Sequence, residues 1–213
     1  MGELNRNAVA QLPPADGVDL TEFPAADPPS GNYFRAHTIG RGPWFFASAG
    51  SGRFDIQKPN GSCYLADRPE TAIRESLGVF TATTGCVTSE MAEQKQVSFL
   101  ALPGGLRAAN LSDHLAIRYK VTRELSTMSD YSVPHSWAKA FHSNGFGGVR
   151  YSSRFTTEPG PNSWAVFGED GEDAGRKFGH VRPITGREAC EEAGIRVLPP
   201  PGRTSVYRVI YPV

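Results

Sequence analysis

The stretch CYLADRPETAIRESLGVF, residues 63–80, contains the change of pattern that decides the fold class. Its first four residues form a short apolar run with the length of a strand. Asp67 then marks the start of a helix, as its expected N-cap. Ile73, Leu77 and Phe80 recur at helical spacing, which predicts that these three side chains face the core. A strand that passes directly into a helix indicates a fold that mixes both elements.

Short apolar runs broken by glycine and proline flank this stretch on both sides. Strands are expected at residues 44–47, 63–66, 97–102, 149–153, 164–167 and 205–211, while 111–125 fits no single pattern. A helix is expected over Val133–Asn144 with Gly145 as its left-handed end. Thr185 and Glu188 form a capping-box pattern that opens a further helix, which Gly194 closes. This irregular alternation predicts a compact α+β domain rather than a doubly wound parallel sheet.

The charges of the chain balance, with 22 Lys and Arg against 22 Asp and Glu in 213 residues. Such a protein has no general field that draws it to nucleic acid or to an anionic membrane, so we expect neither as a partner. Cys63, Cys86 and Cys190 cannot all pair and form no CxxC motif, which is typical of reduced thiols. The chain begins without the apolar run of a signal peptide and has no stretch that could span a bilayer, so a cytoplasmic protein is expected.

The first 30 residues differ in composition from the rest of the chain. They contain Pro13, Pro14, Pro24, Pro28 and Pro29 among acidic and small residues. Such a segment buries little apolar surface, so residues 1–30 are expected to form a flexible arm. The alternative is an arm that wraps the body of the chain or the second copy of a homodimer. Residues 31–168 then form the main domain, and residues 169–213 form an extension packed on it.

Four segments resemble, in this order, the RES-domain family. They are YFRA at 33–36, GRF at 52–54, YLA at 64–66 leading into TAIRESL at 71–77, and GGVRYSSR at 147–154. Between them, DYS at 130–132 and SWAKAFH at 136–142 are also similar to members of the family. The match covers roughly residues 33–168, so the main domain is expected to be a RES-like catalytic domain.

The resemblance implies a fold similar to that of ADP-ribosyltransferases, with a split β core, flanking helices and a cleft that holds NAD⁺. It implies an enzyme that consumes NAD⁺ as a substrate, by phosphorolysis or hydrolysis of the nicotinamide–ribose bond, and that needs no cofactor. It also implies a toxin neutralised by an antitoxin protein with a helix-turn-helix domain. Two alternatives remain open: an ADP-ribosyltransferase that modifies a protein, and a non-catalytic nucleotide-binding module.

The arginine, glutamate and serine for which the family is named are carried over to Arg35 or Arg53, Glu75 and Ser153. The letters Arg74 and Ser76 beside Glu75 are a coincidence. The resemblance thus implies Glu75, Arg35 and Ser153 as catalytic residues. Ser152 remains the alternative to Ser153, because a slip of one residue moves a strand side chain to the other face of the sheet.

The chemistry of NAD⁺ fits these residue types. A guanidinium fork donates two hydrogen bonds to neighbouring phosphate oxygens, so Arg35 and Arg53 are expected to bind the pyrophosphate. A carboxylate stabilises the ribosyl cation that develops as nicotinamide leaves, which is the role expected of Glu75. Two alternatives for Glu75 remain open: it orients the ribose hydroxyls, or it activates the acceptor as a general base. Glu75 falls on the helix face away from the core stripe, so this role requires that a cleft cover that face.

Further substrate contacts are expected from three side chains. The ring of Tyr64 is suited to stacking on nicotinamide or adenine, although a strand tyrosine is equally typical of a core. Ser153 is expected to donate a hydrogen bond to ribose or phosphate, and His37 lies two residues from Arg35. No histidine pair stands at metal-ligand spacing with a glutamate or cysteine, so no metal is expected.

Overall fold

The computed structural model describes residues 11–29, 31–102, 104–158, 160–173, 182–200 and 202. Its strands are β1 (Ala25–Ala26), β2 (Asn32–Thr38), β3 (Phe45–Phe46), β4 (Asn60–Ala66), β5 (Cys86–Thr88), β6 (Lys95–Ala101), β7 (Ala108–Asn110), β8 (Gly148–Ser152), β9 (Asn162–Glu169), β10 (Gly171–Glu172), β11 (Ile184–Thr185) and β12 (Arg196–Leu198). Its helices are α1 (Pro69–Thr84), α2 (Ser89–Glu93), α3 (Ser132–Ser143) and α4 (Gly186–Glu192), with 3-10 helices η1 (His114–Tyr119) and η2 (Arg123–Ser126).

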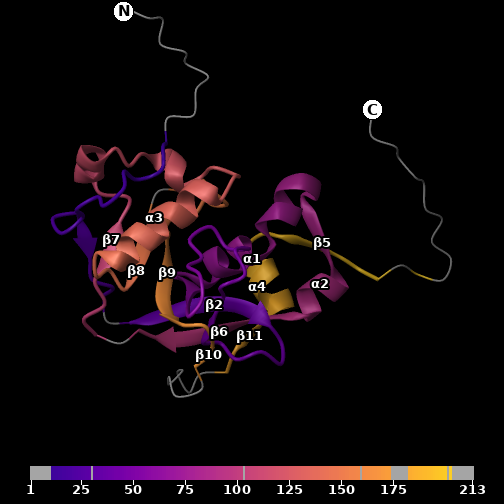
Figure 1. Ribbon diagram of the computed structural model, residues 1–213. Helices are drawn as coiled ribbons and strands as arrows, with labels where there is room; N and C mark the ends of the chain where they lie inside the picture. Colours follow the sequence, from indigo (N-terminus) through magenta and orange to yellow (C-terminus); the bar gives the residue numbers. More distant parts are fainter. Residues whose placement is uncertain are drawn as a thin grey trace, which may run out of the picture.

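A mixed eight-stranded sheet, in the order β1-β7-β8-β9-β4-β2-β6-β11, forms the centre of the fold (Figure 1). Neighbouring strands run antiparallel except β7 and β8. β4 pairs with β9 along its full length, and β2 pairs likewise with β6. Between β2 and β4, however, only Phe34 and Ala66 are paired. The sheet is therefore split at its middle, and the predicted α+β fold with a split β core and flanking helices is confirmed.

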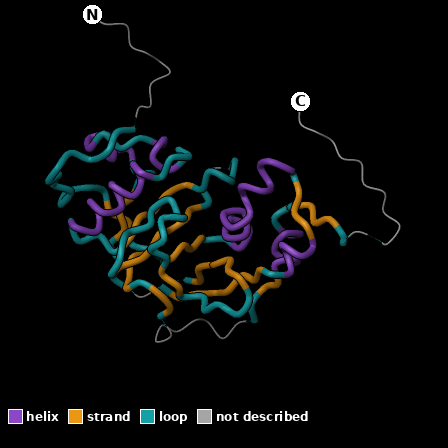
Figure 2. The backbone as a smooth tube through the Cα atoms, turned by 45° about the vertical axis from the view of Figure 1, so that its right-hand side comes forward, coloured by secondary structure: helices purple, strands orange, loops and turns teal. Residues whose placement is uncertain are grey.

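Helices pack against the two halves of the sheet as separate groups. α3 covers β8 and β9 through Trp137 and Phe141, while α1 and α4 pack on β2 and β6 through residues such as Ile73 and Cys190. Figure 2 shows the strands lying between these two groups of helices. A third apolar cluster, which includes Trp44, lies on the opposite face of the sheet. The split in the sheet thus coincides with the boundary between two helical layers.

Residues 11–29 pack on the body of the protein. Leu20 and Phe23 are buried in the cluster beneath α3, where Phe23 lies 4.8 Å from Phe141 between ring centroids. The indole Nε1 of Trp137 donates to the carbonyl of Leu12 at 2.8 Å. Of the two expectations for the Pro-rich segment, this part follows the one in which it wraps the chain, because two large apolar side chains anchor it. The expectation of a flexible arm is corrected over these residues.

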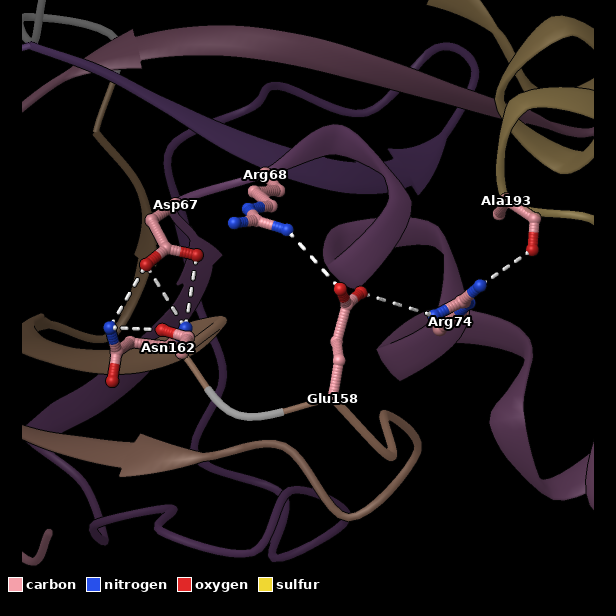
Figure 3. A network of polar contacts seen from close by, with 7 residues as sticks. Asp67, Arg68, Arg74, Glu158, Asn162 and Ala193 are labelled. Carbon is pink, nitrogen blue, oxygen red and sulfur yellow. Dashed lines mark hydrogen bonds and ion pairs between the residues drawn. The ribbon is translucent and has the colours of Figure 1, made fainter.

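The start and end of α1 differ from the sequence prediction. The N-cap is Arg68, which makes no capping bond, and the Asp67 carboxylate instead accepts hydrogen bonds from the backbone and side-chain nitrogens of Asn162 at 3.0 Å (Figure 3). The helix continues to Thr84, and Phe80 is 52% exposed rather than in the core. The predicted stripe therefore ends at Leu77, because the last turns of α1 are not covered by the neighbouring layer.

Other local predictions are confirmed. α3 matches the predicted helix to within a residue at each end, and Gly145 has the left-handed φ of 78°. Thr185 and Glu188 form the reciprocal capping box at the start of α4, and Gly194 behind it has a φ of 69°. The ambiguous stretch 111–125 contains η1 and part of η2. The strand predicted at 205–211 lies outside the described residues.

A network of polar contacts holds the segment after β8 against α1 (Figure 3). The Glu158 carboxylate lies 3.5 Å from a guanidinium nitrogen of Arg68 and 4.0 Å from one of Arg74. Arg74 also donates to the carbonyl of Ala193 at 2.8 Å, which ties α1 to α4. Arg74 therefore has a structural position beside Glu75. Within the described part of the chain, no helix is both long and apolar enough to cross a membrane.

Candidate active site

A cavity of about 310 Å³ opens where β2 and β4 diverge. Its walls come from both strands, from α1, from the turn at 51–53 and from the segment that follows β8. Arg53, Tyr64, Glu75, Tyr131 and Arg154 are among its lining residues. Tyr131 and Tyr151 complete the lining, so the cavity collects polar and aromatic side chains from several separate segments of the chain.

Glu75 projects from α1 into this cavity. Its side chain is half-buried as a whole, but the Oε1 atom is fully buried and has no hydrogen-bond partner. Burial raises the pKa of Glu75, while the hydroxyl of Ser153, the guanidinium groups of Arg53 and Arg154 and the hydroxyl of Tyr151 act in the opposite direction. The face of α1 away from the core stripe is thus covered, as the expected role of Glu75 requires. A buried carboxylate oxygen without a partner is costly unless a ligand donates to it.

Arg53 reaches the cavity from the turn before β4 and is 7% exposed. Its Nη1 donates to the carbonyl of Met128, and its guanidinium lies over the ring of Tyr131, 4.7 Å from the centroid. Burial lowers the pKa of Arg53, and Tyr131 and Glu75 oppose that shift. Arg53 therefore presents a positive charge near Glu75 without a direct ion pair between the two.

A brace of hydrogen bonds fixes the turn that carries Arg53. The hydroxyl of Tyr64 donates to Oδ1 of Asp55 at 2.8 Å and accepts from the backbone nitrogen of Phe54 at 2.8 Å. Oδ2 of Asp55 accepts from the backbone nitrogen of Gly52 at 2.9 Å. A Cβ atom at Gly52 would overlap both Asp55 and Tyr64, so only glycine fits there. The hydroxyl of Tyr64 is thus committed to the turn, and its ring lines the cavity.

The segment after β8 brings a second arginine to the cavity and places a buried serine beside Glu75. Ser153 is 4% exposed, accepts a hydrogen bond from the backbone nitrogen of Phe155 at 3.1 Å and interacts through its hydroxyl with Glu75. The hydroxyl of Ser152 lies instead 3.2 Å from that of Ser112, in an exposed position. Arg154 lines the cavity, and its buried Nε has no hydrogen-bond partner. The structure therefore places Ser153, and not Ser152, beside Glu75.

Arg35 lines the cavity from β2, one residue after the single pair that joins β2 to β4. Its Nη1 donates to the carbonyl of Phe45 at 2.8 Å and contacts the sulfur of Cys63. Arg35 also lines a second cavity of about 180 Å³ further along β2, and His37 lines only that second one. Nε2 of His37 lies 2.8 Å from the hydroxyl of Ser98. Of the predicted residues, Glu75, Arg53, Tyr64 and Arg35 thus line one cavity, Ser153 lies beside Glu75, and His37 lies apart.

Sequence reasoning assigned no role to Tyr131, Tyr151 or Arg154. All three line the cavity. Tyr131 lies in the DYS segment and the other two in the GGVRYSSR segment, so the resemblance pointed to their segments but not to the side chains. Among the described residues, no group of three or more His, Cys, Asp or Glu side chains could hold a metal ion.

The fold and the cavity together define a class: a mixed α+β protein in which a split sheet presents a buried carboxylate between guanidinium groups. The family model of the RES domain matches residues 10–185, and the chain therefore belongs to the RES-domain family. Among solved structures, it is similar to a chain of the M. tuberculosis MbcT–MbcA toxin–antitoxin complex, with a TM-score of 0.62 and 14% sequence identity. That similarity covers 80% of this chain and 92% of the other. No curated protein matches the sequence.

Proposed function

We propose that this protein is an NAD⁺-consuming enzyme that breaks the nicotinamide–ribose bond, and that it acts as the toxin of a toxin–antitoxin pair. The observation that carries the proposal is the buried, unpartnered Oε1 of Glu75 in a cavity that three arginines also line. Membership of the RES-domain family supports the substrate. The toxin–antitoxin complex among the structural neighbours supports the biological role.

Glu75 is the residue that we assign to the reacting sugar. Cleavage of the glycosidic bond builds positive charge on the ribose ring, and a carboxylate close to the anomeric carbon stabilises that charge. Because Oε1 is buried and has no partner, a ribose hydroxyl that donates to it would replace a lost interaction with solvent. Burial raises the pKa of Glu75 and so favours its protonated form, whereas the neighbouring Arg53 and Arg154 act in the opposite direction and favour the ionised form that this role needs.

The arginines are assigned to the pyrophosphate. A cavity of about 310 Å³ is at the small end of ligand pockets and suits the nicotinamide riboside half of NAD⁺. The phosphates would then lie toward the edge of the cavity, within reach of Arg53 and of the free N–H groups of Arg35. One N–H of Arg35 is bound to the carbonyl of Phe45, but a guanidinium has five donors. The ring of Tyr64 faces the same cavity and is assigned to stacking on nicotinamide.

The deciding experiment measures nicotinamide release from NAD⁺ by the purified protein and by two glutamine variants of α1. Glu75→Gln should reduce turnover by roughly 10²-fold or more, which corresponds to about 2.7 kcal/mol of transition-state stabilisation. Glu70→Gln is the matched control, since Glu70 lies on the same helix and also has a buried oxygen without a partner, but does not line the cavity. Equal activity of Glu75→Gln and the wild type would refute the proposal.

The same assay separates the possible acceptors. Turnover that rises with added inorganic phosphate indicates phosphorolysis, and turnover in its absence indicates hydrolysis. Release of nicotinamide only when a protein target is present indicates an ADP-ribosyltransferase. Binding of NAD⁺ without any release would assign a nucleotide-binding module instead of an enzyme. Growth arrest on expression, relieved by Glu75→Gln, tests the role as a toxin.

A further inference from the structure

A second cavity lies beside the first along β2, and of the residues that line it the proposed reaction uses only Arg35. It has a volume of about 180 Å³ and is lined by residues of β2, of the 41–45 turn and by Lys95 at the start of β6. Arg35 and Ala36 line both cavities, so the two are neighbours that share one wall. Because β2 is a continuous strand, the relation between the two cavities is fixed by the fold.

Positive charge is concentrated around this cavity. Arg35, Arg41 and Lys95 all line it, and none of them forms an ion pair with a carboxylate in the described part of the chain. One carboxylate, that of Glu172, lies over Gly42, which also lines the cavity, so three positive charges stand against one negative charge there. Burial lowers the pKa of Lys95, and Arg41 lowers it further, as expected where positive charges are close and not neutralised.

The polar groups of this cavity are held in place by neighbours. Nζ of Lys95 donates to the hydroxyl of Thr38 at 3.3 Å. His37 is 6% exposed and lies between the hydroxyl of Ser98 and the carbonyl of Thr38, at 2.8 and 3.2 Å. Burial and the neighbouring cations lower the pKa of His37, so at neutral pH it contributes ring nitrogens and no additional charge. The charge available to a ligand therefore comes from the two arginines and the lysine.

We propose that this second cavity is a binding subsite for a phosphoryl group, separate from the position of the reacting sugar. Two guanidinium forks and one ammonium group match a compact, multiply charged tetrahedral anion better than they match a carboxylate. In a protein without net charge, such a local cluster is the way to capture an anion. The phosphoryl group has two possible sources, free inorganic phosphate and the 2′-phosphate of NADP⁺. The NADP⁺ source alone rests on the proposed function.

The test compares the wild type with the double variant Arg41→Gln, Lys95→Gln, which leaves Arg35 and the first cavity intact. The variant Arg118→Gln, Lys120→Gln is the control, because it removes the same charge at two exposed positions outside the cavity. Binding of inorganic phosphate is measured by calorimetry at constant ionic strength. Affinities for NADP⁺ and NAD⁺ are measured in the Glu75→Gln background, where turnover does not interfere.

We expect the double variant to lose phosphate affinity, or the preference for NADP⁺ over NAD⁺, by at least tenfold, and the control to lose neither. Loss in the first measurement assigns free phosphate as the ligand, and loss in the second assigns the dinucleotide. The inference would be overturned if the wild type binds phosphate weakly and has equal affinity for both dinucleotides. It would also be overturned if the control loses as much affinity as the double variant.

If the double variant has a lower melting temperature than the wild type, the same measurements on the single variants Arg41→Gln and Lys95→Gln decide. Phosphate binding without nicotinamide release would refute the proposed function and leave this subsite standing.

Discussion

The hydroxyl of Tyr64 supports a quantitative prediction. Tyr64→Phe removes its bond to the Asp55 carboxylate, and it leaves the backbone nitrogen of the buried Phe54 without an acceptor. A hydrogen bond to a charged group contributes about 1.5–3 kcal/mol, and an unsatisfied buried donor costs about 1–3 kcal/mol. Since the two effects share one turn and are not additive, we expect a total of about 3 kcal/mol. In a chain of this length, that lowers the melting temperature by roughly 6–12 °C.

Thermal unfolding at neutral pH, followed by calorimetry, measures this loss. Tyr33→Phe is the control, because that buried tyrosine donates one bond, to the neutral carbonyl of Pro29 at 2.9 Å, and should lose only about 1 kcal/mol. NAD⁺ affinity should fall in Tyr64→Phe and stay constant in Tyr33→Phe, because Tyr64, unlike Tyr33, contributes to holding the turn that carries Arg53. If both variants melt at the same temperature, the brace contributes nothing beyond an ordinary hydrogen bond and the reasoning fails.

Three further outcomes follow from burial and packing. Because burial raises the pKa of Glu75, the stability contributed by its protonated form is present below the unfolded pKa of about 4.3 and is lost as the pH rises through the folded pKa. Near neutral pH, Glu75→Gln should therefore have a higher melting temperature than the wild type, and the difference should shrink toward about pH 4. A difference in melting temperature that does not depend on pH contradicts this. Gly78→Ala should destabilise the protein in chemical denaturation, although alanine is the better helix former, because its Cβ would overlap the ring of Phe155. Leu20→Ala should cost about 2–5 kcal/mol of unfolding free energy, and a loss below about 0.5 kcal/mol would show that the segment is not part of the core.

The elements predicted correctly are those that local chemistry determines. The capping box of Thr185 and Glu188 is complete within four residues, and Gly145 supplies the left-handed conformation that ends α3 without help from the rest of the fold. Phe80 and Asp67 were predicted wrongly because their surroundings are not local. Whether Phe80 is buried depends on how far the neighbouring layer extends, and Asp67 is bound by Asn162, 95 residues away.

The candidate site could be predicted in part for the same reason. Periodicity placed Glu75 away from the core stripe, but only the fold shows that this face is covered by the cavity. The choice between Ser152 and Ser153 depends on register at the end of β8, which the sequence does not determine to one residue. Tyr131 lines the cavity and contacts Arg53, although the two residues are 78 positions apart in the sequence. No pattern near either residue indicates that they meet.

Because residues 11–29 dock beneath α3, this part of the core cannot form early in the synthesis of a new chain. Gln11 is bound to Glu124 and Leu12 to Trp137, at separations of 113 and 125 positions. During synthesis from the N-terminus, Phe23 therefore remains without its partners Phe141 and Phe146 until those residues have left the ribosome. The cavity itself waits longer, because Arg154 must also emerge, so an unfinished chain cannot yet assemble the site.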